Sequence, residues 1–135
     1  MDQAPLVEGQ IADGLKLIER LTECGETVTA AAWVHETDGG RWYLYLVTPL
    51  VSDEEGSPPA YRRIEEVRQT MPESDWIGRF QIIAMRPSHP VARAILDVQR
   101  HHLGGRQGWY SGGSLGMLSI EGAYIYPPLV PASGN

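Results

Sequence analysis

The sequence predicts a single α+β domain, in which a mixed β-sheet is packed by about three helices in the order α-β-β-α-β-α-β-β. Three observations predict this class: a β-hairpin pattern between Thr27 and Val47, three stretches with helical spacing of apolar residues, and one later stretch that is apolar on both sides. At 135 residues the chain has the length of one domain. We expect residues 1–8 to form a flexible lead-in, residues 9–128 the domain, and residues 129–135 an extended tail.

The hairpin is the element that the sequence indicates most clearly. Two β-prone runs flank the turn signal DGG at residues 38–40. A three-residue loop, with the last glycine in the left-handed conformation, would pair Val34 with Leu44. A two-residue loop would place Trp33 beside Leu44 and mix apolar with polar positions. We therefore expect the first register.

In that register the two faces of the hairpin differ in chemistry. One face is apolar and is expected to pack on the core; it carries Val28, Ala30, Ala32, Val34, Trp42, Leu44 and Leu46. The other face combines aromatic rings with polar tips; it carries Thr29, Trp33, His35, Arg41, Tyr43 and Tyr45. The second face is either covered by another part of the chain, buried in a dimer, or open to a ligand.

The remaining elements follow from periodicity and from stop signals. Apolar spacing predicts helices over about 9–24 and 58–71, and a third helix that ends at Gly104-Gly105; Ser57 and Ser88 are the expected caps of the second and third. The stretch 79–86 is apolar on both faces, which predicts a central strand reached by a parallel crossover beside the hairpin. Residues 118–126 are expected to form one or two closing strands.

A glycine-rich loop is predicted between the third helix and those strands. It contains Gly112-Gly113-Ser114-Leu115-Gly116, which satisfies the G-x-S-x-G pattern of serine hydrolases. That fold places its histidine after the serine, and no histidine follows His102. The match is therefore not interpreted as a nucleophile.

Composition limits the kinds of partner. The net charge is −6, with most acidic side chains in the first 60 residues, which argues against nucleic-acid binding through phosphate neutralisation. No signal peptide and no apolar run long enough for a membrane span is visible. The single cysteine, Cys24, fits a reducing compartment. These features predict a cytoplasmic protein, bacterial in style, with no membrane partner.

No cofactor or metal site is predicted. The acidic loop Ser52–Gly56 lacks the alternating oxygen ligands of a calcium loop. His101 and His102 are neighbours and therefore point about 100° apart on a helix, unlike the i, i+4 pair of a zinc helix.

The sequence favours a non-enzymatic protein that binds another protein or itself as a homodimer. The candidate binding residues are aromatic and polar side chains of the hairpin and of the glycine-rich loop, the types enriched at interface centres: Trp33, His35, Arg41, Tyr43, Tyr45, Arg106, Trp109 and Tyr110. The alternative is a small phosphodiesterase or nuclease. It would use His35, His101 or His102 for acid-base chemistry, with Arg41 or Arg106 stabilising the transition state.

Overall fold

The computed structural model describes residues 8–37, 41–71 and 82–127. Within them the chain forms three helices and a six-stranded mixed sheet, which confirms the predicted α+β class. The elements in chain order are α1 (Glu8–Glu23), β1 (Ala30–Glu36), β2 (Trp42–Val47), α2 (Pro58–Arg68), β3 (Ile82–Met85), α3 (Pro90–His101), β4 (Gly108–Tyr110), β5 (Ser114–Leu115) and β6 (Leu118–Ile125).

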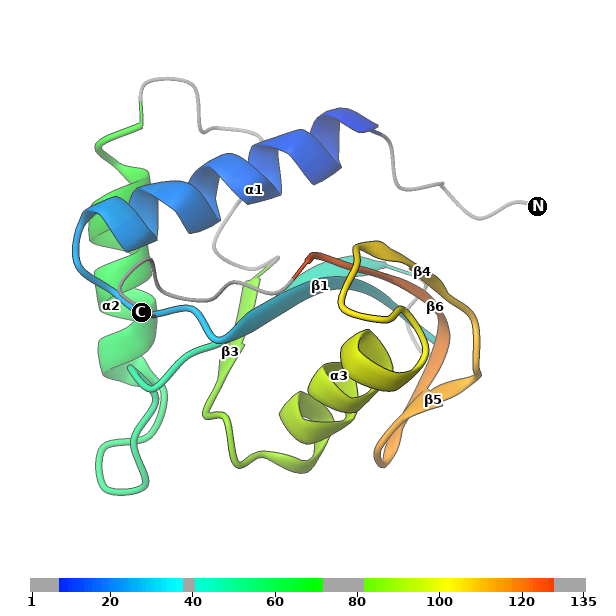
Figure 1. The fold of residues 1–135 in the computed structure, drawn as a ribbon. Helices are drawn as coiled ribbons and strands as arrows, with labels where there is room; N and C mark the ends of the chain where they lie inside the picture. Colours follow the sequence, from blue (N-terminus) through cyan, green and yellow to red (C-terminus); the bar gives the residue numbers. More distant parts are fainter. Residues whose placement is uncertain (1–7, 38–40, 72–81, 128–135) are drawn as a thin grey trace.

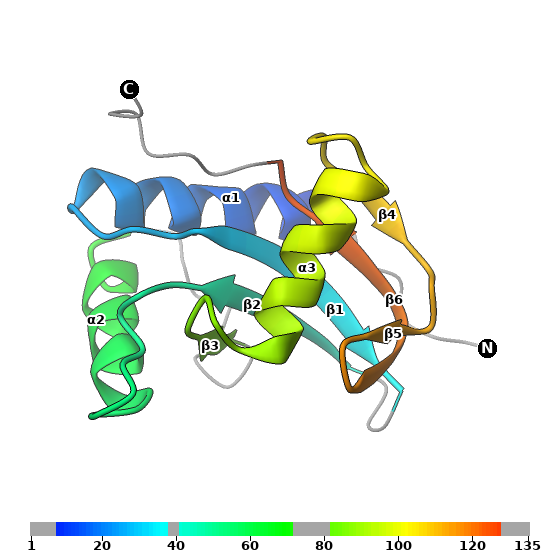
Figure 2. The same cartoon turned by 60° about the horizontal axis from the view of Figure 1, so that its bottom comes forward.

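The sheet lies between two layers of helices. Its strand order is β3-β2-β1-β6-β4, and β5 pairs with β6. In Figures 1 and 2, α1 and α2 lie on one side of the sheet and α3 on the other. Two hydrophobic clusters correspond to these layers, one shared by α1, α2 and the sheet, the other by α3 and the sheet. The central strands are consequently buried on both faces.

The predicted crossover is confirmed, because β2 and β3 are parallel and α2 connects them. The part of the predicted strand that precedes Ile82 lies outside the described residues. The lead-in 1–7 and the tail 129–135 also lie outside them, whereas Glu8 already belongs to α1.

The predicted register of the hairpin is wrong by one residue. Trp33 pairs with Leu44, and the last pair of the ladder joins His35 to Trp42, whose rings stack at 4.9 Å. The expected register assumed that one face of the hairpin is apolar and the other polar. That assumption fails because helices cover both faces, so both must be largely apolar.

Helix caps and the glycine-rich stretch also differ from expectation. The N-cap of α3 is His89, whose Nδ1 accepts a hydrogen bond from the backbone N–H of Val91 at 3.0 Å; Ser88 is not the cap. Ser57 is the N-cap residue of α2, but its side chain makes no capping bond. The predicted glycine-rich loop contains two short strands, β4 and β5, which pair with β6.

Candidate functional site

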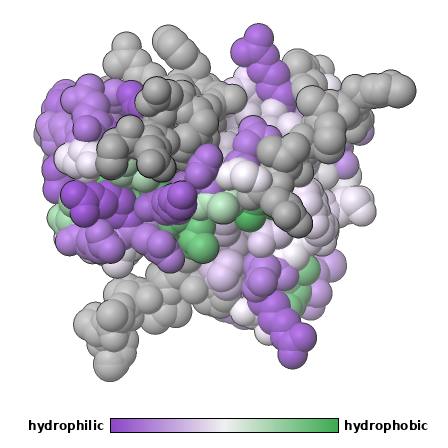
Figure 3. All heavy atoms as spheres, turned by 90° about the horizontal axis from the view of Figure 1, so that it is seen from above, coloured by the Kyte–Doolittle hydropathy of each residue, from purple (hydrophilic) through white to green (hydrophobic). Residues whose placement is uncertain are grey.

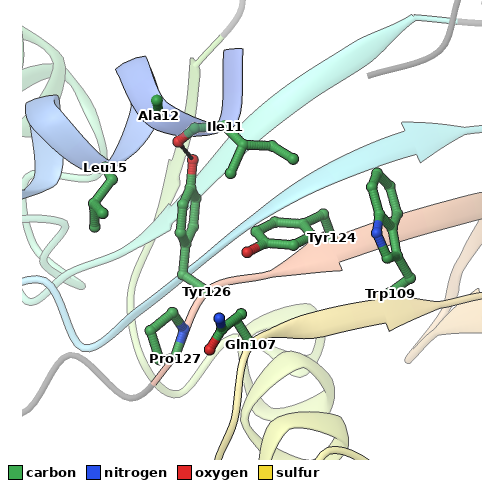
Figure 4. A pocket seen from close by; sticks show the side chains of 8 residues that line it. All are labelled: Ile11, Ala12, Leu15, Gln107, Trp109, Tyr124, Tyr126 and Pro127. Carbon is green, nitrogen blue, oxygen red and sulfur yellow. Dashed lines mark hydrogen bonds between the residues drawn. The ribbon is translucent and has the colours of Figure 1, made fainter. Parts of the chain in front are cut away.

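A groove lined by aromatic and aliphatic side chains opens between α1 and the β4 edge of the sheet. It encloses about 440 Å³ and is lined by Ile11, Ala12, Leu15, Gln107, Trp109, Tyr124, Tyr126 and Pro127. Figure 4 shows the three aromatic rings side by side along β6 and β4, with the α1 residues on one side and Gln107 and Pro127 on the other. We call these eight residues the aromatic groove.

The groove exists because α1 covers only part of its face of the sheet. The helix packs onto the hairpin strands β1 and β2 through three buried residues, Leu17, Ile18 and Leu21. Its first turns carry Ile11 and Leu15, which are only half-buried. Strands β6 and β4 extend beyond the helix, so Trp109 is exposed and Tyr124 is only half-buried.

A chain of hydrogen bonds holds α1 on the sheet. The indole Nε1 of Trp33 donates to the hydroxyl oxygen of Tyr126 at 2.9 Å, and this hydroxyl donates to the carbonyl of Ile11 at 2.7 Å. Gly14 lies directly above the pair, where a Cβ atom would overlap with the Tyr126 hydroxyl oxygen. The glycine therefore permits the close approach of helix and sheet.

Tyr126 is fixed at its backbone as well as at its hydroxyl. Its N–H donates to the carbonyl of Ala31 at 3.1 Å, and its carbonyl accepts a bond from the side-chain amide of the buried Gln99 at 2.5 Å. The side chain of Tyr126 is 1% exposed. The floor of the groove is thus preorganised, and a ligand would not have to order it.

Three aromatic rings, from the exposed Trp109 to the buried Tyr126, form a ladder in edge-to-face contact along the groove. The ring centroids of Trp109 and Tyr124 are 5.2 Å apart, and those of Tyr124 and Tyr126 are 5.4 Å apart, with interplanar angles of 67° and 89°. Trp109 also meets Trp42 edge-on at 6.3 Å. Trp109 is 57% exposed, which is unusual for so large an apolar side chain.

The surface around α1 is otherwise hydrophilic. Seen from the α1 side, a small hydrophobic area near the middle of the view borders a group of hydrophilic residues (Figure 3).

The structure distributes the predicted aromatic hairpin face over both sides of the sheet. Trp33 and His35 face α1 and α2, where they are 0% and 3% exposed. Tyr43 and Tyr45 belong to the cluster that packs with α3, and Tyr45 is 4% exposed. The predicted cluster of Trp33, Tyr43 and Tyr45 on one face is therefore wrong, because the true register alternates them.

The other predicted site residues are also spread over the molecule. Arg41 is exposed at the start of β2, and Arg106 is exposed between α3 and β4. Tyr110 lies on the α3 side, where its ring meets that of His102 at 5.5 Å. Of the eight predicted residues, Trp109 alone lines the aromatic groove, and Trp33 supports it from behind.

The histidines of the enzymatic alternative are not brought together. His35 lies on the α1 side of the sheet, stacked against Trp42, and its Nε2 is buried without a hydrogen-bond partner among the described residues. His101 and His102 are exposed at the end of α3, on the opposite side. Among the residues that the structure describes, no group of three or more histidine, cysteine or acidic side chains could hold a metal ion.

Several groove residues were not predicted as site residues from the sequence. Tyr124 and Tyr126 were expected only as strand residues, and Ile11 and Leu15 only as part of a helical stripe. A signal was present for the tyrosines: their spacing of two residues places both on one side of an extended segment. The approach of α1 to this strand could not be found, since it depends on contacts across more than 100 residues, such as that between Ile11 and Tyr126.

Two buried tyrosines, Tyr126 at the groove and Tyr45 on the α3 side of the sheet, predict a loss of stability in alkali. Burial raises the pKa of Tyr126, and burial together with the hydrogen bond from its hydroxyl to Glu36 at 2.5 Å raises the pKa of Tyr45 above the ordinary 10.0. Because the folded protein keeps both phenols neutral, their contribution is complete below pH 10 and is lost as pH rises above it.

We therefore expect the free energy of unfolding to fall above pH 10, by up to about 1.4 kcal/mol per pH unit for each such tyrosine. Urea unfolding between pH 8 and about pH 11.5 measures this. Tyr45→Phe should be less stable at pH 8 but should lose stability less steeply. Equal slopes for the two proteins would contradict the assignment.

Comparisons with known proteins give this site no precedent. No protein-family model matches the chain, and neither a curated protein nor a solved structure is significantly similar to it. None of the helices in the described part of the chain is long and apolar enough to cross a membrane.

Proposed function

We propose that this protein is a small non-enzymatic binding protein that takes an extended, proline-containing protein segment in its aromatic groove. The observation that carries the proposal is the exposed Trp109 in edge-to-face contact with Tyr124, above a floor fixed by Tyr126. Trp and Tyr are the residue types on which binding energy concentrates at protein interfaces. The one cysteine supports a cytoplasmic place of action.

The lining favours a neutral ligand. None of its eight side chains is charged. Neighbouring rings touch one another at 5.2 and 5.4 Å, so they leave no space between them for a cation of the kind that aromatic cages enclose. Of these rings, Trp109 is 57% exposed, whereas Tyr126 is 1% exposed and lies at the floor.

The few polar groups favour a peptide over a sugar. Gln107 offers a side-chain amide, Trp109 an indole N–H and Tyr124 a hydroxyl, which suit isolated backbone carbonyls of an extended chain. A polyproline II segment has no internal hydrogen bonds and loses little conformational entropy on binding, and such segments dock on aromatic-lined grooves. The groove therefore fits this ligand class best.

Binding of a labelled octaproline peptide tests the proposal, with a Gly-Ser peptide of equal length as the control ligand. We expect a Kd on the order of 0.1 mM for octaproline and no measurable binding of the control. Trp109→Ala should weaken binding by about 10- to 30-fold, since it removes the exposed aromatic ring of the groove. Fluorescence anisotropy of the labelled peptide gives both values.

The matched control variant is Met117→Ala, because Met117 is 87% exposed and is not part of the groove lining. It should bind octaproline as the wild type does. Equal binding of octaproline and of the Gly-Ser peptide, or an unchanged Kd for Trp109→Ala, would refute the proposal.

A further inference from the structure

We infer that the segment bound in the aromatic groove carries acidic side chains next to its prolines, at the end that passes Arg106. The inference rests on the proposed function and names the charge of the ligand. None of the side chains that line the groove is charged, so a charge on the ligand has to be recognised at the rim. One end of this rim is basic.

Arg106 lies at the end of the groove that Gln107 and Pro127 form. It directly precedes Gln107, so its Cα atom is about 3.8 Å from that of a lining residue. Figure 4 shows Gln107 beside Pro127, on the side of the tyrosine rings opposite α1. The Arg106 side chain is exposed. A ligand that runs along the rings and extends past Gln107 therefore comes within reach of its guanidinium group.

The C-terminal end of α3 is tied to the same end of the groove. The side-chain amide of Gln99 donates to the carbonyl of Tyr126 at 2.5 Å, and the backbone N–H of Gly105 donates to the carbonyl of Gln99 at 2.8 Å. Figures 1 and 2 show the loop after α3 leading to β4 beside the end of β6. The last turn of α3 and this loop therefore form one edge of the molecule together with the groove end.

This edge is basic although the whole protein is acidic. The net charge is −6, yet residues 98–120 contain Arg100, His101, His102 and Arg106 and no aspartate or glutamate. The helix dipole favours cations in the last turn of α3, but it does not explain Arg106, which lies outside the helix. An acidic group on a ligand is thus favoured at this edge.

The two arginines of this edge have no acidic partner in the described part of the chain. Neither Arg100 nor Arg106 makes an ion pair there. On the opposite wall of the groove, by contrast, the Nζ of Lys16 already lies 3.8 Å from a carboxylate oxygen of Asp13. A guanidinium group can bind a carboxylate through two parallel hydrogen bonds, so Arg106 suits an aspartate or glutamate of the ligand.

Competition against labelled octaproline, followed by fluorescence anisotropy, tests the inference. The competitors are hexaproline peptides with blocked termini that carry an Asp-Asp pair at one end or the other, and matched peptides with Lys-Lys instead. At an ionic strength of about 20 mM, we expect the better aspartate peptide to bind about 3- to 10-fold more tightly than its lysine counterpart. This ratio should fall below about 2 in about 0.5 M salt, because salt screens exposed charges.

Charge reversal at Arg106 gives the decisive measurement. Arg106→Glu should bind the lysine peptide more tightly than the aspartate peptide, and Arg106→Gln should lose most of the preference. Arg93→Glu is the matched control, since Arg93 is also exposed in α3 but lies about two turns before Arg100. It should keep the preference of the wild type. A wild-type protein without this preference, or an Arg106→Glu variant that retains it, would overturn the inference.

Failure of the inference is distinguishable from failure of the proposed function. If octaproline binds but the aspartate peptides compete no better than the lysine peptides, the inference is wrong and binding of proline segments stands. If octaproline does not bind, the proposed function fails and the inference falls with it. A Gly-Ser peptide with the Asp-Asp pair should not compete; competition equal to that of the proline peptide would show that the acidic pair binds without the groove, which also contradicts the inference.

Discussion

Replacing Trp33 with alanine is expected to lower the free energy of unfolding by about 3–5 kcal/mol, the range measured when large buried aromatic residues are truncated. Trp33 is fully buried between α1 and the sheet, and its indole N–H donates to Tyr126. The variant loses this contact area and leaves a cavity beneath the helix. Urea unfolding followed by circular dichroism measures the loss.

Trp109→Ala is the matched control for this prediction. Trp109 is 57% exposed, so its truncation should change the free energy of unfolding by no more than about 0.5–1 kcal/mol. The two tryptophans thus separate the stability of the fold from binding in the groove. A loss below about 1 kcal/mol for Trp33→Ala would contradict its place in the core.

Gly14→Ala is expected to destabilise the protein by about 1–3 kcal/mol. This is the opposite of the usual effect, since replacing glycine with alanine normally stabilises a helix by about 1 kcal/mol. The new Cβ would overlap with the hydroxyl oxygen of Tyr126 and lie 3.0 Å from the Trp33 Nε1. The hydroxyl cannot move away easily, because Tyr126 is buried. Its hydroxyl oxygen also accepts a hydrogen bond from Trp33 and donates one to the carbonyl of Ile11. Urea unfolding again measures the effect.

A double-mutant cycle identifies the cause of that loss. Tyr126→Phe removes the overlapping oxygen, and the ring carbon left behind is 3.4 Å from the new Cβ, an ordinary contact. In the Tyr126→Phe background, Gly14→Ala should therefore destabilise the protein clearly less than it does in the wild type, and the 3.0 Å contact with the Trp33 Nε1 is the strain that remains. Gly9→Ala is the control in the same helix, since its Cβ would meet nothing within 4 Å. Additive effects of the two substitutions would contradict the proposed contact.

Local signals predicted the elements of this fold well. The helices α1 and α3 followed from apolar periodicity, and the hairpin followed from its turn signal, because both patterns depend on residues close in sequence. The parallel pairing of β2 with β3 followed from the order of strand, helix and strand. These are the features for which neighbours along the chain carry most of the information.

The hairpin register and the two short strands depend on more distant contacts. The hairpin register was predicted wrongly because no local pattern indicates that α3 covers the sheet face that carries Tyr43 and Tyr45. Strands β4 and β5 lie in a glycine-rich stretch with little strand propensity, and they form because β6 offers them a ladder. Tertiary pairing here overrides local preference.

The candidate site was the part least accessible from sequence. The sequence marked Trp109 as a binding residue, but the groove around it combines residues of α1 with residues more than 90 positions later. The exposure of Trp109 results from the short reach of α1 over β4 and β6, which no local pattern records. The site could therefore be defined only from the packed fold.

A nuclear magnetic resonance titration tests the central claim, that the aromatic groove binds proline-containing segments. The four tryptophans give separate indole N–H signals, and the one that is missing from Trp109→Ala identifies Trp109. With octaproline, we predict that the Trp109 indole signal shifts progressively to saturation, while the signal of the buried Trp33 moves little. An unchanged Trp109 signal at millimolar octaproline would contradict the claim.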